Sequence, residues 1–333
     1  MFLILSLLSV FAASVPMLTF LIIVWFMDRH DREPIWLFLL TFLWGACGAV
    51  CFALVGNESL IALLGFVIGP ENAETYGAVL VAPVVEEPMK ALVLFAVMFS
   101  RHFDNATDGF VYGAAAGLGF GMTENLFYFL NVAAAGDMWS WMFTVVIRTF
   151  FSAVMHACAT SCVGAMLGFA RFRGWGWKGV APFIGFGVAM SIHATWNGML
   201  TLGDITENST FMVANFGLFI VEFLILVGVF QLALWEERAT IRRELADEVR
   251  SNLLPLAHAK NAGSWFRRSS KHWVPAGVPH GQYVKALTTL ALRKHQARNA
   301  SSGAYGFYSE EVVRLRREVS ALLALGNKSA AKA

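Results

Sequence analysis

Seven apolar stretches dominate the chain, and each is long enough to cross a lipid bilayer as a helix. A membrane-spanning helix needs about 20 mostly apolar residues, because its backbone polar groups must all bond within the helix once water is excluded. The stretches cover residues 2–27, 35–56, 78–100, 109–132, 139–170, 179–200 and 211–235. Of the 333 residues, 57% are hydrophobic and only 14% are charged, which is far from the composition of a soluble domain.

A shorter apolar run at residues 60–69 ends at Pro70 and cannot cross a bilayer. We expect it to form a short interfacial or re-entrant helix. If it were counted as a crossing, the Lys and Arg residues in the loops either before it or after it would fall on the outer side of the membrane. The predicted fold class is therefore all-α: a polytopic membrane helix bundle with about seven spans, one short extra helix and a helical tail.

The basic residues are distributed unequally between the two sides of the membrane. With the N-terminus outside, the inside segments are residues 28–34, 101–108, 171–178 and 236–333, which hold 2, 1, 3 and 17 Lys and Arg residues. The outside segments hold none. Cytoplasmic loops carry an excess of Lys and Arg, so we predict a multi-pass membrane protein with an external N-terminus and a cytoplasmic C-terminus.

The composition changes after residue 235. Residues 236–333 carry a net charge of +9, whereas residues 1–235 carry −7. We divide the chain there into a membrane-embedded bundle, 1–235, and a basic cytoplasmic tail, 236–333, which we expect to lie near anionic lipid. A regulatory or substrate-docking role of the tail is open. The basic residues match no nucleic-acid-binding motif, so nucleic acid is not an expected partner.

Polar residues of the types used in metal binding and acid–base catalysis interrupt five of the spans. They are Glu86, Glu87 and Lys90; Glu124; Arg148 and His156; His193 and Asn197; and Glu222. Ionisable groups inside a bilayer are costly, and so they usually face the bundle interior and serve a function. Each carboxylate and imidazole lies 14 to 16 residues from the cytoplasmic end of its span, about 21–24 Å at helical rise. One layer of such groups on separate helices predicts a single site.

The residue types in this layer suit a catalytic zinc ion. Two neutral imidazoles and one carboxylate, with a fourth position open, are typical of catalytic Zn²⁺, which lowers the pKa of a coordinated water to about 7. We predict that Glu124, His156 and His193 are the metal ligands. Asn197, one helical turn after His193, is positioned to donate a hydrogen bond to an oxyanion.

Glu86 and Glu87 are the candidates for the general base that takes a proton from water. Lys90 follows them at i,i+4 and i,i+3, and both spacings allow an ion pair on a helix, so spacing alone does not choose between the two glutamates.

Two further polar residues allow alternative interpretations. Arg148 lies about 34 Å from the cytoplasmic boundary, so it is either an interfacial anchor or a residue that positions substrate. Glu222 shares the depth of the predicted site without a motif around it, and it either balances the charge of Lys90 or Arg148 or acts as a further ligand.

Four short motifs in residues 80–200 resemble those of the PrsW-type intramembrane metalloproteases. Residues 86–90 resemble the EExxK motif of that family, residues 120–124 its FxxxE motif, Arg148 with residues 156–164 its isolated Arg followed by H-x-x-x-T-x-x-x-G, and residues 193–197 its H-x-x-W-N motif. The resemblance implies cleavage of membrane-anchored proteins, in the best-known case an anti-sigma factor. It does not cover the tail.

The distantly similar CAAX-prenyl proteases have EExxxR and FxxxH where this chain has EExxK and FxxxE. In those relatives the first Glu acts on water. The resemblance therefore assigns Glu86 as the general base and Glu87 as the partner of Lys90, while Glu124 stands where those relatives have a His.

Two other functional classes fit parts of the pattern. In an ion- or proton-coupled transporter or channel, midplane carboxylates and histidines bind ions or relay protons. In a membrane assembly factor, the same polar residues form a stabilising network. The absence of an internal repeat and the uniform depth of the metal-type residues favour the protease, and bound zinc would distinguish the three.

Overall fold

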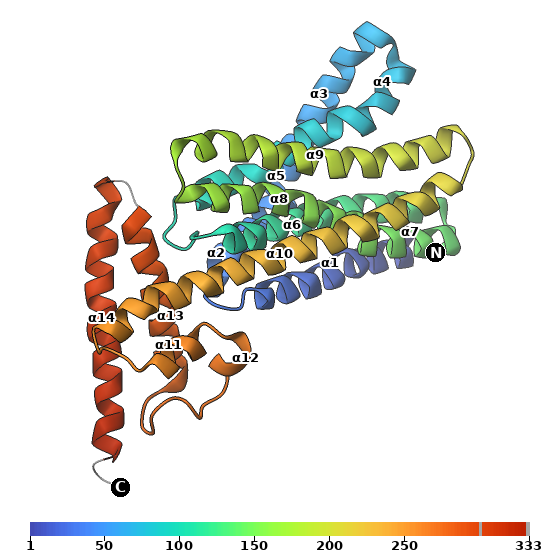
Figure 1. Ribbon diagram of the computed structural model, residues 1–333. Coiled ribbons are helices and arrows are strands. Elements are labelled where there is room, and N and C mark those ends of the chain that lie inside the picture. Colours follow the sequence, from blue (N-terminus) through green and yellow to red (C-terminus); the bar gives the residue numbers. More distant parts are fainter. Residues whose placement is uncertain (300–301, 331–333) are drawn as a thin grey trace. The chain divides into compact units, whose positions relative to one another are not determined.

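The structure is a computed structural model that describes residues 1–299 and 302–330. Within these ranges it is helical throughout and contains no strand, which confirms the all-α prediction. The chain forms two compact units (Figure 1). We call Met1–Met27 with Glu33–Phe230 the membrane unit, and Asp28–Arg32 with Gln231–Ala333 the tail unit.

The membrane unit contains nine complete α-helices and three π-helical segments among the described residues. They are α1 (Phe2–Met27), α2 (Ile35–Leu43), η1 (Trp44–Ala49), α3 (Val50–Ile68), α4 (Pro70–Tyr76), η2 (Gly77–Val81), α5 (Ala82–Val97), α6 (Ala106–Ala135), α7 (Met138–Ile147), η3 (Arg148–Ser152), α8 (Ala153–Arg171) and α9 (Trp175–Ile205). The long helix α10 (Thr210–Arg250) begins in this unit and continues into the tail unit.

Five of the described helices are long and apolar enough to cross a membrane. They are Phe2–Met27, Ile35–Ile68, Met138–Arg171, Trp175–Ile205 and Thr210–Arg250. The other two predicted spans correspond to α5 with the preceding η2, where Glu86, Glu87 and Lys90 interrupt the apolar sequence, and to α6, which is rich in Gly and Ala instead of large apolar side chains. The count of seven spans stays a prediction.

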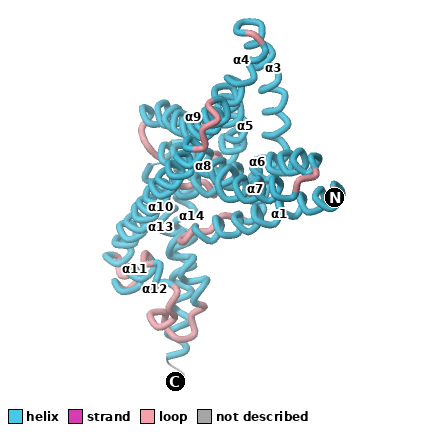
Figure 2. Tube along the Cα trace, turned by 90° about the vertical axis from the view of Figure 1, so that its right-hand side faces the viewer, coloured by secondary structure: helices cyan, strands magenta, loops and turns pink. Residues whose placement is uncertain are grey.

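The apolar run at residues 60–69 does not form a separate helix as expected. It continues the helix Ile35–Ile68 without a break, because no Pro and no turn residue with special backbone angles separates it from the preceding span. The helix ends only at Gly69, whose φ of 87° and ψ of 150° suit glycine alone, and Pro70 then starts α4. Helices α3 and α4 form a hairpin that extends away from the rest of the membrane unit (Figures 1 and 2).

Helix α6 packs backbone to backbone against α8. A Cβ atom on Gly113 would lie 2.5 Å from the carbonyl oxygen of Thr160, and one on Gly117 would lie 2.3 Å from that of His156. Contacts this short exclude any side chain larger than hydrogen, as in membrane helix pairs with small residues four apart. The contact fixes the height of His156 relative to α6, which carries Glu124.

We expect Gly117→Ala to destabilise the protein by about 1–3 kcal/mol, because the added methyl group overlaps the α8 backbone at His156. Gly187→Ala on α9 is the matched control, since a Cβ there meets no atom within 4 Å. The control should be neutral or slightly stabilising, because alanine favours a helix. Thermal unfolding in detergent measures both, and equal stability of the two variants would contradict the packing described.

The tail unit adds α11 (Leu256–Ala262), α12 (Trp265–Arg268), α13 (His280–Asn299) and α14 (Ser302–Ala330) to the end of α10. These helices enclose a hydrophobic core that includes Leu245, Leu287 and Val319. Inside it the Tyr283 hydroxyl lies 2.8 Å from Nδ1 of His258. Burial raises the pKa of Tyr283 and lowers that of His258, so both groups are neutral at pH 7. The tail is thus a folded module with its own core.

Candidate active site

Lys90 on α5 is the centre of the polar network inside the membrane unit. Its fully buried ammonium group donates to Glu87 Oε1 at 2.8 Å, to Glu86 Oε2 at 3.3 Å and to Nδ1 of His156 at 2.9 Å. It also lies 4.0 Å from the centre of the Phe120 ring. A buried ammonium group is tolerated only when its charge and its three donors are matched, and this arrangement matches both.

Glu87 is fully buried, and both of its carboxylate oxygens have partners. Oε1 accepts from Lys90 and lies 2.9 Å from Nδ1 of His193, while Oε2 accepts from the hydroxyl of Thr160 at 3.1 Å. Because a carboxylate only accepts hydrogen bonds, Nδ1 of His193 carries the proton and Nε2 is left with its lone pair. This carboxylate–histidine pair is the arrangement that orients metal-binding imidazoles.

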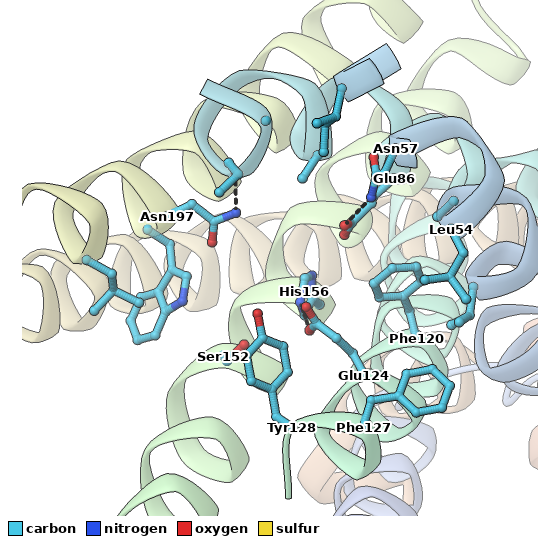
Figure 3. A pocket seen from close by; sticks show the side chains of 18 of the residues that line it. Leu54, Asn57, Glu86, Phe120, Glu124, Phe127, Tyr128, Ser152, His156 and Asn197 are labelled. Atoms are coloured by element: carbon cyan, nitrogen blue, oxygen red, sulfur yellow. Dashed lines mark hydrogen bonds and ion pairs between the residues drawn. The ribbon is translucent and has the colours of Figure 1, made fainter. Parts of the chain in front are cut away.

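Glu86 faces a cavity of about 640 Å³ that Asn57, Glu124, His156 and Asn197 also line. Figure 3 shows the Glu86 carboxylate pointing into this space across from Glu124 and His156. Its Oε1 accepts from Nδ2 of Asn57 at 3.2 Å. The two adjacent glutamates therefore have different surroundings, since Glu86 borders an open space and Glu87 is enclosed.

Glu124 joins His156 to Arg148. Its Oε2 lies 2.8 Å from Nε2 of His156 and accepts from Nη2 of Arg148 at 2.6 Å. The guanidinium group of Arg148 also donates to Asn125 at 3.0 Å and stacks 3.5 Å from the centre of the Tyr128 ring. Arg148 thus points into the cavity, which supports a role in positioning over that of an interfacial anchor.

Glu86, His156 and His193 each offer one ligand atom, and these atoms lie within 4.8 Å of one another. Tetrahedral zinc with bonds of about 2.0–2.2 Å separates its ligand atoms by about 3.5 Å. Small side-chain movements would bring the three ligand atoms to this separation. The Lys90 ammonium group lies between Glu86 and His156 and uses the lone pair of His156 Nδ1, so a metal bound to this nitrogen would replace that hydrogen bond. The donor set fits a divalent metal.

This set overlaps the predicted ligands without being identical to them. Both contain His156 and His193, but the structure groups them with Glu86, whereas the sequence predicted Glu124. Glu124 contacts His156, and no hydrogen bond or ion pair joins it to His193 in the described part of the chain. The third ligand therefore stays a prediction.

Each π-helical segment has a carbonyl group that accepts a hydrogen bond from a side chain of another helix, and η2 and η3 also line the cavity. Thr123 donates to the Ala46 carbonyl at 2.7 Å, Asn197 to that of Ala78 at 2.8 Å, and Asn125 to that of Arg148 at 3.3 Å. π-Helical turns occur frequently at functional sites, where they redirect side chains.

Asn197 illustrates why the sequence requires such a bond. In η2 the N–H of Ala82 bonds to the carbonyl of Gly77, five residues earlier. Pro83 would bond to Ala78 in the same register, but proline has no N–H. Nδ2 of Asn197 satisfies the free carbonyl of Ala78, and its second N–H has no partner among the described residues and belongs to a side chain that lines the cavity.

Sequence reasoning missed Asn57 and the contact of Thr160 with Glu87. Asn57 fell just outside the predicted span 35–56, so it was assigned to an external segment. The absence of a helix-breaking residue between Asn57 and Ile68 was the signal that the helix continues. Glu222 is not part of the site, because it has no ion pair or hydrogen bond with Lys90, Arg148 or any other residue in the described ranges.

A family model described as the PrsW family intramembrane metalloprotease matches residues 33–229 of the chain. Three relatives named Protease PrsW are similar to parts of it. That of Geobacillus kaustophilus (strain HTA426) is 29% identical over 146 residues, which is 44% of this chain and 59% of the relative. That of Clostridioides difficile (strain 630) is 35% identical over 106 residues, 31% of this chain and 43% of the relative. That of Bacillus subtilis (strain 168) is 28% identical over 149 residues, 44% of this chain and 61% of the relative.

The chain thus spans between 43% and 61% of the length of these relatives. No solved structure matches it significantly. The matched relatives and the apolar helices indicate a multi-pass bacterial membrane protein. The family model covers more than half of the sequence and includes every residue of the candidate site, and the chain therefore belongs to the PrsW family of intramembrane metalloproteases.

Proposed function

We propose that this protein is a metal-dependent intramembrane endopeptidase that cleaves membrane-anchored proteins, an anti-sigma factor being the substrate that the family resemblance implies. The observation that carries the proposal is the grouping of Glu86, His156 and His193 beside a cavity large enough for an extended peptide segment. Membership of the family supports it. The family match does not favour the transporter or channel.

We assign the metal, proposed to be zinc, to His156 and His193 with Glu124 as the third ligand. A second assignment exchanges the two carboxylates, so that Glu86 binds the metal and Glu124 acts as the base. A bound divalent ion would polarise the scissile carbonyl group and make water a stronger acid. Glu87 would hold the imidazole of His193 in the required orientation through its 2.9 Å contact.

In the first assignment, Glu86 takes a proton from the attacking water and passes it to the leaving amine as the peptide C–N bond breaks. Its position on the cavity supports this role, because water and substrate can reach it there. The free N–H of Asn197 donates to the oxyanion that develops on the carbonyl group. Arg148, held by Glu124 and Tyr128, positions the substrate chain in the cavity.

Proteomics of single-span membrane proteins tests the proposed function. Cells with the wild-type protein should accumulate cleaved fragments that cells with the His193→Ala variant lack. Ser191→Ala is a suitable control, because this exposed residue on the same helix bonds only to its own helix backbone. Identical fragment patterns in the wild type and the His193→Ala variant would contradict proteolysis.

We propose that the N-terminus is outside a bacterial plasma membrane and that the tail is cytoplasmic, with about seven spans. A reporter fused after Asn105 should then report cytoplasm and one fused after Gly203 should report the exterior, because all Lys and Arg outside the spans then lie inside. The reverse pattern would contradict both the topology and the shared depth of the site residues.

We expect Asn57→Ala to lower kcat about tenfold or more with little change in KM, because the hydrogen bond from Asn57 fixes the Glu86 carboxylate. A hydrogen bond to a charged group contributes about 1.5–3 kcal/mol, which corresponds to a factor of this size. Metal content and thermal stability should stay at wild-type levels, which separates positioning from folding. Ser59→Ala, an exposed change on the same helix, is the control. Wild-type kcat in the Asn57→Ala variant would exclude this role.

A further inference from the structure

Three arginines of the tail unit gather where α10 leaves its apolar stretch. That stretch ends at Trp235, which is 70% exposed and suits the boundary of a bilayer. Arg238 and Arg242 follow three and seven residues later on the same helix, about 4.5 and 10 Å further along its axis. The headgroup region adds roughly 5–7 Å to each side of the hydrocarbon core, so the backbone of Arg238 falls within it and that of Arg242 lies just beyond it.

The connection between α11 and α12 brings the third arginine to this place. A Cβ atom on Gly263 would lie 2.8 Å from Cγ of Arg242 and 3.5 Å from the carbonyl oxygen of Arg238, so the connection lies directly on α10. Arg267 on α12 follows four residues later. Arg238 and Arg267 are the charged neighbours of Arg242.

No carboxylate neutralises these three side chains. Within residues 1–299 and 302–330 none of the three forms a salt bridge or a side-chain hydrogen bond, and Nε of Arg238 is buried without a partner. The adjacent carboxylate of Glu237 instead lies 3.1 Å from Nδ1 of His30. Like charges held together without a counter-ion destabilise a fold, so this cluster has the features of a site for an anion.

The surroundings of the cluster are those of a membrane interface. Trp265 and Phe266 precede Arg267 and are 42% and 81% exposed. Arg268 donates two hydrogen bonds of 2.9 Å to the carbonyl groups of Arg29 and His30, in the segment that directly follows α1. Helix α12 is therefore attached to Arg29 and His30 of the tail unit, and its Arg267 lies near Arg242 of α10. Exposed aromatic rings at such a position are typical of the interfacial belt of membrane proteins.

We propose that Arg238, Arg242 and Arg267 bind the phosphate group of an anionic phospholipid, with Trp265 and Phe266 in the adjoining interface. Guanidinium groups bind phosphate through paired hydrogen bonds. The N–H donors of these three arginines would therefore gain acceptors when the lipid binds. The site specifies which surface of the tail meets the membrane. It does not depend on the proposed peptidase activity.

The test uses the full-length protein in detergent, titrated with phosphatidylglycerol and with phosphatidylcholine and observed by native mass spectrometry. Each basic residue near an anionic surface contributes about fivefold in affinity, so changing all three arginines to Gln should weaken phosphatidylglycerol binding roughly 100-fold. The control changes Arg250, Arg314 and Arg317 to Gln, which removes the same charge from exposed positions elsewhere in the tail unit. It should retain wild-type affinity.

Equal affinity of the wild type and the triple variant for phosphatidylglycerol would overturn the proposal, as would an equal loss in the control. Equal affinity for phosphatidylcholine would exclude an anion site. Displacement of the lipid by an equal concentration of inorganic phosphate would show that free phosphate is the ligand. If the triple variant does not fold, the single exposed change Arg267→Glu takes its place and should still weaken lipid binding.

Discussion

Glu86→Gln is expected to reduce turnover by about 10²–10⁴-fold while the protein still folds and binds metal, because Gln keeps the shape of the side chain but cannot take a proton. The new side chain has one oxygen in place of the two that accept from Asn57 and Lys90, so a loss of thermal stability should accompany the loss of turnover. Turnover of a reconstituted single-span substrate measures the effect. Glu71→Gln, an exposed change on α4, is the control for the loss of one carboxylate.

Glu87→Gln should act on stability instead. Its carboxylate is enclosed by Lys90, His193 and Thr160, and removing one member of a buried ion pair costs about 3–5 kcal/mol. Thermal unfolding in detergent should show the loss. If Glu87→Gln is stable but inactive while Glu86→Gln turns over at the wild-type rate, the two roles are reversed. If both variants cleave normally, the hydrolytic mechanism proposed here is wrong.

The second large effect concerns the metal. His156→Ala and His193→Ala should each abolish cleavage and lose bound metal, because even changes to residues behind the ligands weaken metal binding by about 10–100-fold. Elemental analysis of the purified protein measures the metal, and size-exclusion chromatography confirms that the variants remain folded. Ser191→Ala again controls for a change on α9. Full metal occupancy in both histidine variants would exclude them as ligands.

The same measurement separates the two assignments of the carboxylates. If Glu124 is the third ligand, Glu124→Gln should lose metal and Glu86→Gln should keep it. The opposite result would support the grouping that lies within 4.8 Å in the structure and would make Glu86 a ligand.

Most of the site could be anticipated because depth in a membrane follows from counting residues along straight helices. Such counts place Glu86, Glu87, Glu124, His156 and His193 in one layer, and the structure brings all five into one network. They also place Glu222 in this layer, and the structure leaves it outside the network. The spacing of Lys90 allows an ion pair with either glutamate, and the structure has both, whereas the resemblance assigned only Glu87 as its partner.

Residue counts along a helix predict neither the direction of a side chain nor the residue at which the helix ends. Arg148 was placed near the outer boundary by its position on the axis, yet its guanidinium group points into the cavity toward Glu124. Asn57 was excluded because a polar residue after an apolar run looks like a loop, whereas a helix continues through it unless a breaker intervenes. The basic composition of the tail likewise hid its core, because charge reports the surface and not the interior.

The π-helical segments have a consequence for insertions and deletions in the chain. Each contains one residue more than a regular helical turn would use, so deleting one residue would restore an ordinary α-helix without breaking the backbone. Such a deletion in η2 would leave the preceding helix and the following one in nearly the same relative orientation, because a π-helical turn uses one residue more than an α-helical turn for about the same rotation. A deletion in the α-helical residues between η2 and Glu86 would instead turn the two parts by about 100° relative to each other. Glu86 and Lys90 would then no longer face the helices they meet, although every functional side chain would still be present. The three π-helical segments are therefore the places where the membrane unit should best tolerate the loss of one residue.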